Sequence, residues 1–363
     1  MKYRMDEITE SCLGKMLDAK KNKGEYQPYL ANINVRWGSF DLENLSLMRF
    51  GKDEEERYGI KYGDLIMCEG GEPGRCAIWR DELPNMKIQK ALHRIRPNTE
   101  LVDVEYLYYW FLLSGRNDLL RRHFTETTIK HLPGETLKQL VIDLPDMKTQ
   151  KGISSVLRVI DKKITVNEHI NDNLEQQMHL IFENMMAKAA THKLSGEYTI
   201  AQNLATVVTG KEDANFSVPN GKYKFFTCSN TPLLCDKYVF DSSSILIAGN
   251  GDFNVKHYSG KFNAYQRTYV LTPDKKYFGL LYLASLYRIN SFKSRSSGSI
   301  VKFITKSDVE NIPVFIPNDM FYLQELNKLI YLQEQNKLEN ELLVNLRDWL
   351  LPMLMNGQAS VSD

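Results

Sequence analysis

Two glycine-rich stretches have residue types that could bind a phosphate or a cofactor. "EGGEPGRC" at 69–76 and "LIAGNGDF" at 246–253 each place glycines beside an apolar, strand-like run. The first stretch is no P-loop, because it lacks the GxxxxGK(S/T) spacing and the lysine that reaches the phosphates. The second is followed by no helix start, which a dinucleotide site requires. We therefore expect no cofactor on this chain and keep a plain β-turn as an alternative for the first stretch.

A second candidate for chemistry is a metal-dependent nuclease site. Asp146, Asp161 and Lys163 have the letters of a PD…DxK motif, whose carboxylates would hold Mg²⁺. Asp161 and Lys163, however, fall within a helix-periodic stretch on its solvated side, so a charged helix surface is the favoured interpretation. The five cysteines form no CxxC pair and the seven histidines do not cluster, which disfavours a zinc site. A stand-alone nuclease remains an alternative, and we predict no catalytic or metal-binding residues.

Basic, amide and hydroxyl residues near the glycine turns are candidates for DNA contact. Arginine and glutamine can read guanine and adenine edges bidentately, and lysine and small hydroxyls suit phosphate contact. The net charge is only +1, so a DNA-binding face must come from local clusters. The candidates are Arg75, Lys87, Gln89, Lys90, Arg94, Thr128 and Lys130 in the first half, and Lys256, His257, Gln266, Arg267, Arg295, Ser297 and Lys302 in the second.

The elements that carry these residues occur twice. "TTIKHLPGETLKQLVIDLP" at 127–145 aligns with "SIVKFITKSDVENIPVFIP" at 299–317, with apolar positions on apolar positions. Upstream of each copy come a strand entering a glycine turn, a glutamine beside a basic residue (Gln89, Gln266), and an aromatic-rich helical stretch. One such match arises easily by chance, whereas the whole series in order does not. The sequence predicts two tandem copies of one α+β domain.

A long helix is predicted after each copy. Its apolar positions alternate spacings of three and four, as in a coiled coil, and its centre is polar. Antiparallel pairing would bring the amides together, with Asn167 and Asn171 near Gln333–Asn340; two separate surface helices are the alternative. The predicted contact residues are Ile153, Leu157, Ile160, Ile164, Asn167, Asn171 and Leu174 on the first helix, and Leu326, Leu329, Gln333, Asn336 and Leu343 on the second.

Composition places the chain among globular proteins. Hydrophobic residues make up 43% and charged residues 25%. No apolar run reaches the length of a membrane span, so no membrane partner is expected. The start, "MKYRMDEITES", lacks the apolar core of a signal peptide, so we expect a cytoplasmic protein.

Three segments give the sequence a family resemblance. "GDLIMCEGGEPGRCAIW", "DKKITVNEHINDNLEQQ" and "LRDWLLPMLMNGQ" resemble recurring segments of the specificity (S) subunit of Type I restriction–modification enzymes. The layout is also similar, since each repeat ends in "LP" or "IP" before Gln150 or Gln324 opens a long helix.

The resemblance implies a non-catalytic subunit of pseudo-twofold symmetric architecture that reads bipartite double-stranded DNA. The two helices would form an antiparallel spacer that binds two modification (M) subunits, which hold S-adenosylmethionine and methylate adenine. Two restriction (R) subunits, where present, would supply ATP- and Mg²⁺-dependent translocation and cleavage. A protein-interaction scaffold without DNA contact is a further alternative. The expected parts are target-recognition domains at 1–145 and 193–317, spacer helices at 146–192 and 318–356, and a tail at 357–363.

Overall fold

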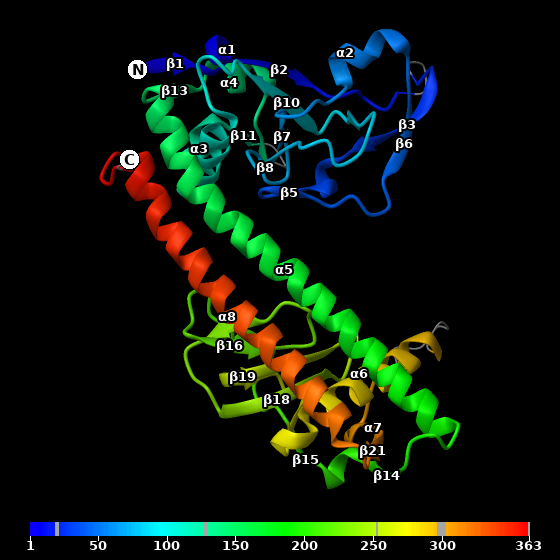
Figure 1. Ribbon diagram of the computed structural model, residues 1–363. Coiled ribbons are helices and arrows are strands. Elements are labelled where there is room, and N and C mark those ends of the chain that lie inside the picture. The colour runs from blue at the N-terminus through cyan, green and yellow to red at the C-terminus, as the bar shows by residue number, and fades with distance from the viewer. Residues whose placement is uncertain (19–21, 127–129, 252, 296–302, 362–363) are drawn as a thin grey trace. The chain divides into compact units, whose positions relative to one another are not determined.

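The computed structural model divides the chain into two compact units (Figure 1). The first unit comprises residues 1–163 and 342–363, and the second comprises residues 164–341. Each unit is described by itself below. The residues described are 1–18, 22–126, 130–251, 253–295 and 303–361.

The first unit begins with short strands and helices that surround a four-stranded sheet of order β2-β10-β7-β8. A second sheet has the order β6-β3-β9. The strands are β1 (Lys2–Arg4), β2 (Thr9–Leu13), β3 (Glu25–Leu30), β4 (Val35–Arg36), β5 (Ser39–Phe40), β6 (Ser46–Phe50), β7 (Leu65–Cys68), β8 (Cys76–Ile78), β9 (Lys87–Ile88), β10 (Leu92–Pro97), β11 (Thr125–Glu126), β12 (Lys130–His131) and β13 (Val141–Asp143). The helices are α1 (Met5–Ile8), α2 (Glu55–Tyr58), α3 (Val104–Arg116), α4 (Gly134–Gln139) and the first part of α5 (Met147–Ala190).

The core of the first unit lies between β7, β8 and the aromatic helix α3. All four residues of β7 are buried, as expected for a continuous apolar run in a central strand. The helix α3 starts at Asp103, whose carboxylate accepts a hydrogen bond from the Tyr106 N–H and so satisfies one free donor of the first turn. Its buried face includes Tyr109 and Phe111, which belong to the same hydrophobic cluster as Leu65.

The second unit contains one six-stranded sheet of order β15-β20-β18-β19-β16-β17 and a separate β14-β21 pair. Its strands are β14 (Gly196–Ile200), β15 (Ala205–Thr209), β16 (Tyr223–Phe226), β17 (Leu233–Cys235), β18 (Phe240–Ala248), β19 (Val255–Ala264), β20 (Thr268–Pro273) and β21 (Pro313–Pro317). Its helices are α6 (Phe278–Arg295), α7 (Lys306–Glu310) and the first part of α8 (Met320–Met355), together with the last part of α5.

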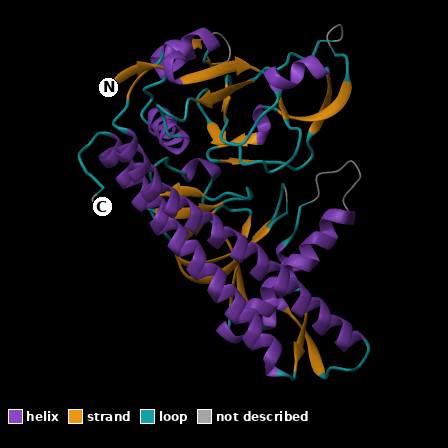
Figure 2. Cartoon of the chain, turned by 45° about the horizontal axis from the view of Figure 1, so that its top comes forward, coloured by secondary structure: helices purple, strands orange, loops and turns teal. Residues whose placement is uncertain are grey.

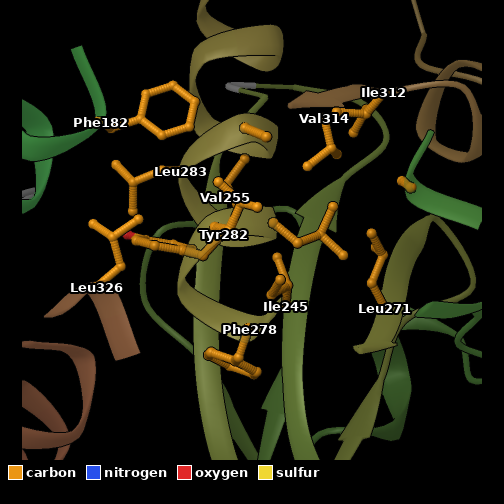
Figure 3. Close-up of a cluster of buried hydrophobic side chains, with 14 of the residues drawn as sticks. Phe182, Ile245, Val255, Leu271, Phe278, Tyr282, Leu283, Ile312, Val314 and Leu326 are labelled. Carbon is orange, nitrogen blue, oxygen red and sulfur yellow. The ribbon is translucent and has the colours of Figure 1, made fainter. Parts of the chain in front are cut away.

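The core of the second unit is centred on α6, which packs with one side against the sheet. Figure 3 shows Tyr282 and Leu283 of α6 among side chains from strands and from both long helices. Ile245 and Leu271 from the sheet and Leu326 from α8 are fully buried in this cluster. The burial of these apolar side chains fastens the helix pair to the sheet of this unit.

Backbone hydrogen bonds show that the two units repeat one fold. Met5 N–H donates to the Leu140 carbonyl at 2.8 Å, and Ala201 N–H donates to the Ile312 carbonyl at 2.9 Å. In each unit a strand at the start of the domain also pairs antiparallel with the strand before the long helix, β1 with β13 and β14 with β21. The predicted tandem repeat is confirmed by these equivalent contacts. Helices and strands mix in both units, as α+β domains require (Figure 2).

The same contacts correct one detail of the sequence alignment. The N–H groups of Lys90 and Gln266 each donate at 2.9 Å to an equivalent backbone carbonyl, of Lys15 and Glu212 respectively. Lys90 is therefore the structural counterpart of Gln266, and the two glutamines noted in the sequence, Gln89 and Gln266, are offset by one residue. Side-chain type guided the alignment, whereas backbone pairing determines which positions are equivalent.

Antiparallel packing of α5 and α8 is present within each unit. In the second unit Asn167 contacts Asn340 while Asn171 contacts Asn336, so position rises on one helix as it falls on the other. In the first unit the buried Leu157 of α5 shares a hydrophobic cluster with Leu351 of α8. The predicted helix spans, 146–192 and 318–356, agree with α5 and α8 within two residues at each end.

Candidate nucleic-acid interface

The first glycine turn connects β7 to β8 as a hairpin. Cys68 N–H donates to the Arg75 carbonyl at 2.8 Å across its base. Gly71 and Gly74 adopt φ of +75° and +97°, which glycine adopts without strain. The Trp37 indole N–H donates to the Glu72 carboxylate at 2.8 Å and holds the tip. The turn is thus a packed β-hairpin, and no helix follows it to supply the phosphate site of a P-loop.

Arg75, at the end of this turn, braces a second loop at 31–34. Its guanidinium donates to the Asn32 carbonyl oxygen at 3.1 Å and to the Asn32 Oδ1 at 2.9 Å. Asn32 in turn donates from Nδ2 to the Gly70 carbonyl at 2.7 Å. The Glu72 carboxylate also accepts from Arg75 at 2.8 Å. Arg75 is therefore half-buried and committed to internal partners, and its clearest role is to position loop 31–34.

The second unit has the same brace with a different residue. Ala248 N–H donates to the Asn254 carbonyl at 2.9 Å, as Cys68 N–H does to that of Arg75, so Asn254 and Arg75 are equivalent. The Asn254 side chain donates to the Cys228 carbonyl at 2.8 Å, within loop 227–230. Lys256 donates to the Ser229 carbonyl in the same loop, and burial lowers the pKa of this lysine. Two equivalent loops are thus held by two equivalent braces.

A glycine at one position in each unit permits a close approach of two backbone segments. A Cβ on Gly14 would collide with the Gln89 carbonyl oxygen, and a Cβ on Gly210 with the Ala264 carbonyl oxygen. These contacts place the turns at 89–91 and 265–267 beside the strand ends. Neither glycine stood out in the sequence, because a close backbone approach leaves no mark except the missing side chain.

Two of the predicted DNA-binding cations are buried. The Lys87 ammonium is fully buried and donates to the Glu55 carboxylate at 2.7 Å. Arg94 is 1% exposed and donates to the Glu10 carboxylate at 2.7 Å and to backbone carbonyls of residues 56, 57 and 59. To face a phosphate, either cation would have to leave these partners and its buried position. Their burial corrects the expectation that they face DNA and gives them a structural role.

His257 also has internal partners. Its Nδ1 lies 3.1 Å from the Glu334 carboxylate and its Nε2 lies 3.2 Å from Gln333 Oε1, both on α8. Burial alone would raise the pKa of Glu334, but the interactions with His257, Ser259 and Lys337 together outweigh it and hold that pKa below its usual value. The histidine therefore connects β19 to α8, which corrects its assignment to a DNA-facing cluster.

The remaining candidates divide by exposure. Lys90, Lys130, Gln266 and Arg267 are exposed, and Gln266 donates to the Asp213 carboxylate at 2.9 Å. Gln89 is half-buried, and its side-chain oxygen accepts from Ala91 N–H at 3.2 Å. The residues Thr128, Ser297 and Lys302, and the side chain of Arg295, lie outside the described residues.

Amide side chains of the two predicted helices contact one another. Asn167 is fully buried and donates to Asn340 Oδ1 at 2.8 Å, and Gln333 donates to the Asn171 carbonyl at 3.0 Å. The amides of the two helices therefore meet, as the antiparallel pairing required. The buried predicted positions are Ile153, Leu157, Ile160, Asn167, Leu174, Leu326, Leu329 and Gln333, and the half-buried ones are Ile164, Asn171, Asn336 and Leu343.

The nuclease alternative was wrong. Asp146 precedes α5 and caps it, accepting from Thr149 N–H at 2.9 Å. Asp161 is not on a solvated face, because it accepts from the Tyr109 hydroxyl at 2.7 Å and from Arg347 at 2.8 Å. Asp146 lies at the start of α5 and Asp161 is 15 residues further on, about 22 Å away at 1.5 Å per residue, too far to share a metal ion. Among the described residues there is also no cluster of three or more potential metal ligands.

The repeated domain, the two glycine hairpins and the amide-centred helix pair define a fold of two equivalent domains, each followed by a long helix. The sequence model of the Type I restriction modification DNA specificity domain matches residues 1–176 and again residues 204–344. The chain belongs to this family and contains two copies of its domain.

The chain is similar to proteins that are named as specificity subunits. The chain is 41% identical over 115 residues to the EcoDI specificity subunit of Escherichia coli, a match that covers 32% of this chain and only 26% of that subunit. It is 21% identical over 348 residues to the MjaIX specificity subunit of Methanocaldococcus jannaschii, covering 83% and 78% of the two chains. A crystal structure of the Type I S subunit from M. genitalium shares the fold, with a TM-score of 0.60, 18% identity, and coverage of 98% and 95%. Among the described residues, no helix is long and apolar enough to span a membrane.

Proposed function

We propose that this chain is the non-catalytic DNA-specificity subunit of a Type I restriction–modification complex, with each unit reading one half of a bipartite target. The observation that carries the proposal is the duplication itself. Two copies of one family domain present equivalent loops with unlike exposed side chains. A shared scaffold with different surface residues suits two different half-sites on one duplex, because base-edge contacts rather than the scaffold specify sequence.

The exposed faces of the long helices support docking of partner subunits. On α8, Tyr331 and Leu338 are 59% and 52% exposed, and Leu342 and Trp349 are 69% and 61% exposed. Each pair is seven residues apart and so lies on one side of the helix. Large apolar side chains in such a row favour an interface with another protein. We assign these exposed side chains, one pair in each unit, to contacts with the two modification subunits, which would carry S-adenosylmethionine, with two restriction subunits that use ATP and Mg²⁺ where the system has them.

The test is methylation mapping with the assembled complex. The chain is co-expressed with its modification subunit, and modified adenines in the host genome are located by sequencing. The expected result is one motif with two specified halves and a gap of fixed length. Exchanging residues 1–145 for those of a relative should change one half only. A contiguous motif, or a change in both halves, would contradict the proposal.

A protein-interaction scaffold without DNA contact is the remaining rival. It predicts that the assembled complex binds a DNA duplex weakly and without dependence on salt. Phosphate contacts instead give an affinity that falls steeply as salt rises, with a slope of about −0.9 per neutralised phosphate. Binding isotherms of the complex at several salt concentrations separate the two. Since the substrate is chromosomal DNA, we place the working complex in the cytoplasm.

A further inference from the structure

The two braced loops, 31–34 and 227–230, occupy equivalent positions in the two units. The family description assigns no role to either loop. Gln89 N–H donates to the Leu30 carbonyl at 3.0 Å, and Tyr265 N–H donates to the Phe226 carbonyl at 2.9 Å, immediately before each loop. The loop in the first unit therefore follows the end of β3, and the loop in the second unit follows the equivalent end of β16. The braces from Arg75 and Asn254 then fix the second residue of each loop.

A cation also binds the third residue of each loop through its carbonyl oxygen. Arg36 donates to the Ile33 carbonyl at 2.5 Å in the first unit, and Lys256 donates to the Ser229 carbonyl in the second. The Arg36 side chain is half exposed. Each loop thus has a backbone held by hydrogen bonds and a cation beside it, although Arg36 also pairs with the Asp41 carboxylate at 3.3 Å. Arginine and lysine are side chains that commonly contact phosphates.

The side chains on these two loops differ in chemistry. Ile33 is 73% exposed. The equivalent Ser229 and its neighbour Asn230 are exposed polar residues. An aliphatic side chain can contact the methyl group of thymine, and an asparagine can pair bidentately with adenine. Asn230 occupies the position of Asn34, which is only 7% exposed in the first unit, whereas Asn230 is exposed. The first loop therefore exposes an apolar side chain, Ile33, and the second exposes an amide, Asn230.

We propose that loops 31–34 and 227–230 read bases, one loop for each half-site, and that Arg75 and Asn254 are positioning residues that hold them. Ile33 and Asn230 are the specificity-determining residues. The inference rests on the proposed function, because it concerns the half-sites that the two units would read.

The test uses the full complex and compares Ile33→Ala, Asn230→Ala and the matched control Asn220→Ala. Asn220 and Asn230 are both exposed, but one precedes β16 and the other follows it. Methylated motifs and methylation rates on a library of target variants are measured for each complex. Asn230→Ala should lose about tenfold or more of discrimination at one base of one half-site. Ile33→Ala should relax a base of the other half-site, and Asn220→Ala should leave both halves as in the wild type.

A brace variant tests the positioning role. Asn254→Val removes the donor to the Cys228 carbonyl and should degrade discrimination in the same half-site as Asn230→Ala, with the other half unchanged. A merely structural role would lower methylation equally at every target sequence and would overturn the positioning assignment. If Ile33→Ala and Asn230→Ala both leave the methylated motif unchanged while the wild type has a bipartite motif, the proposal that these loops read bases is wrong and the proposed function still stands. A wild-type complex without a bipartite motif would instead overturn the proposed function.

Discussion

The amide layer between α5 and α8 gives the sharpest prediction about stability. In the second unit Asn167 is fully buried and donates to Asn340 Oδ1 at 2.8 Å and to the Glu339 carboxylate at 2.7 Å. Asn340 donates in turn to the Ile164 carbonyl at 3.2 Å. The perturbation is a double-mutant cycle of Asn167→Leu, Asn340→Leu and the pair together.

The expected magnitudes follow from what each variant leaves without a partner. Asn167→Leu removes one hydrogen bond between neutral groups, about 1 kcal/mol, and one to a carboxylate, about 1.5–3 kcal/mol. The single variant should therefore lose about 2–3 kcal/mol after the added apolar contact is counted. In the double variant two leucines face each other, so the loss of the Asn167–Asn340 hydrogen bond is offset, but the hydrogen bond to the Glu339 carboxylate is still missing. The double variant should therefore be destabilised by clearly less than the sum of the two single effects, with a remaining loss of about 1.5–3 kcal/mol.

The assay must report on the second unit. All four tryptophans, Trp37, Trp79, Trp110 and Trp349, lie in the first unit, so their fluorescence does not follow this layer. Native-state hydrogen exchange, read by mass spectrometry on peptides from 164–180 and 326–341, measures the opening free energy locally. Peptides from the core of the first unit serve as the internal control and should exchange as in the wild type.

The outcome that refutes the reasoning is additivity. If the double variant is destabilised by the sum of the two single effects, the amides do not act as a pair. If the double variant is as stable as the wild type but its helix peptides show more than one exchange pattern, the helices pair in more than one register. The amide pair would then specify the register at a cost in stability, as buried amides do in coiled coils.

Three further predictions concern the first unit. Gly14→Ala should lower the thermal stability of the first unit strongly, because the added Cβ would collide with the Gln89 carbonyl oxygen. Gly152→Ala, within α5, is the control and should stabilise the unit by about 0.5–1 kcal/mol. Both are measured by tryptophan-monitored thermal unfolding, and equal effects of the two variants would contradict the prediction. Burial lowers the pKa of His93 below 6.5, so the unfolded state takes up its proton first and stability should fall as pH drops below about 6.5. His93→Gln should flatten that pH dependence in urea titrations, and an unchanged slope would show that other groups cause it. Asp161→Asn should lower the free energy of unfolding by about 1–2 kcal/mol. DNA incubated with Mg²⁺ should stay uncut with the wild type and with the variant. Cleavage by the wild type and not by the variant would support the nuclease alternative instead.

The repeat and the helix pair could be predicted from the sequence, because both depend on the spacing of apolar residues. Leu132, Leu137 and Leu140 are buried, as are Ile304 and Val309 at the aligned positions. The alternating spacing of three and four marks the contact side of α5 directly, since the period of a helix is fixed by its geometry. Antiparallel pairing was also predicted from the sequence, because it brings the polar centres of the two helices together.

The sequence could not separate structural from exposed cations. Lys87 and Arg94 look like any other basic residues beside a turn, yet their partners Glu55 and Glu10 are distant along the chain. Whether a charge is solvated or paired depends on which segments fold over it, and one sequence does not encode that locally.

The amino-acid order alone thus determined the duplicated α+β plan, the two long helices and the meeting of their amides, because these depend on local periodicity. Only the tertiary structure decided the one-residue offset between the copies, the tight approach at Gly14 and Gly210, and the braces from Arg75 and Asn254. These features arise where segments remote in the chain come together, and backbone carbonyls, which every residue has, make most of the contacts.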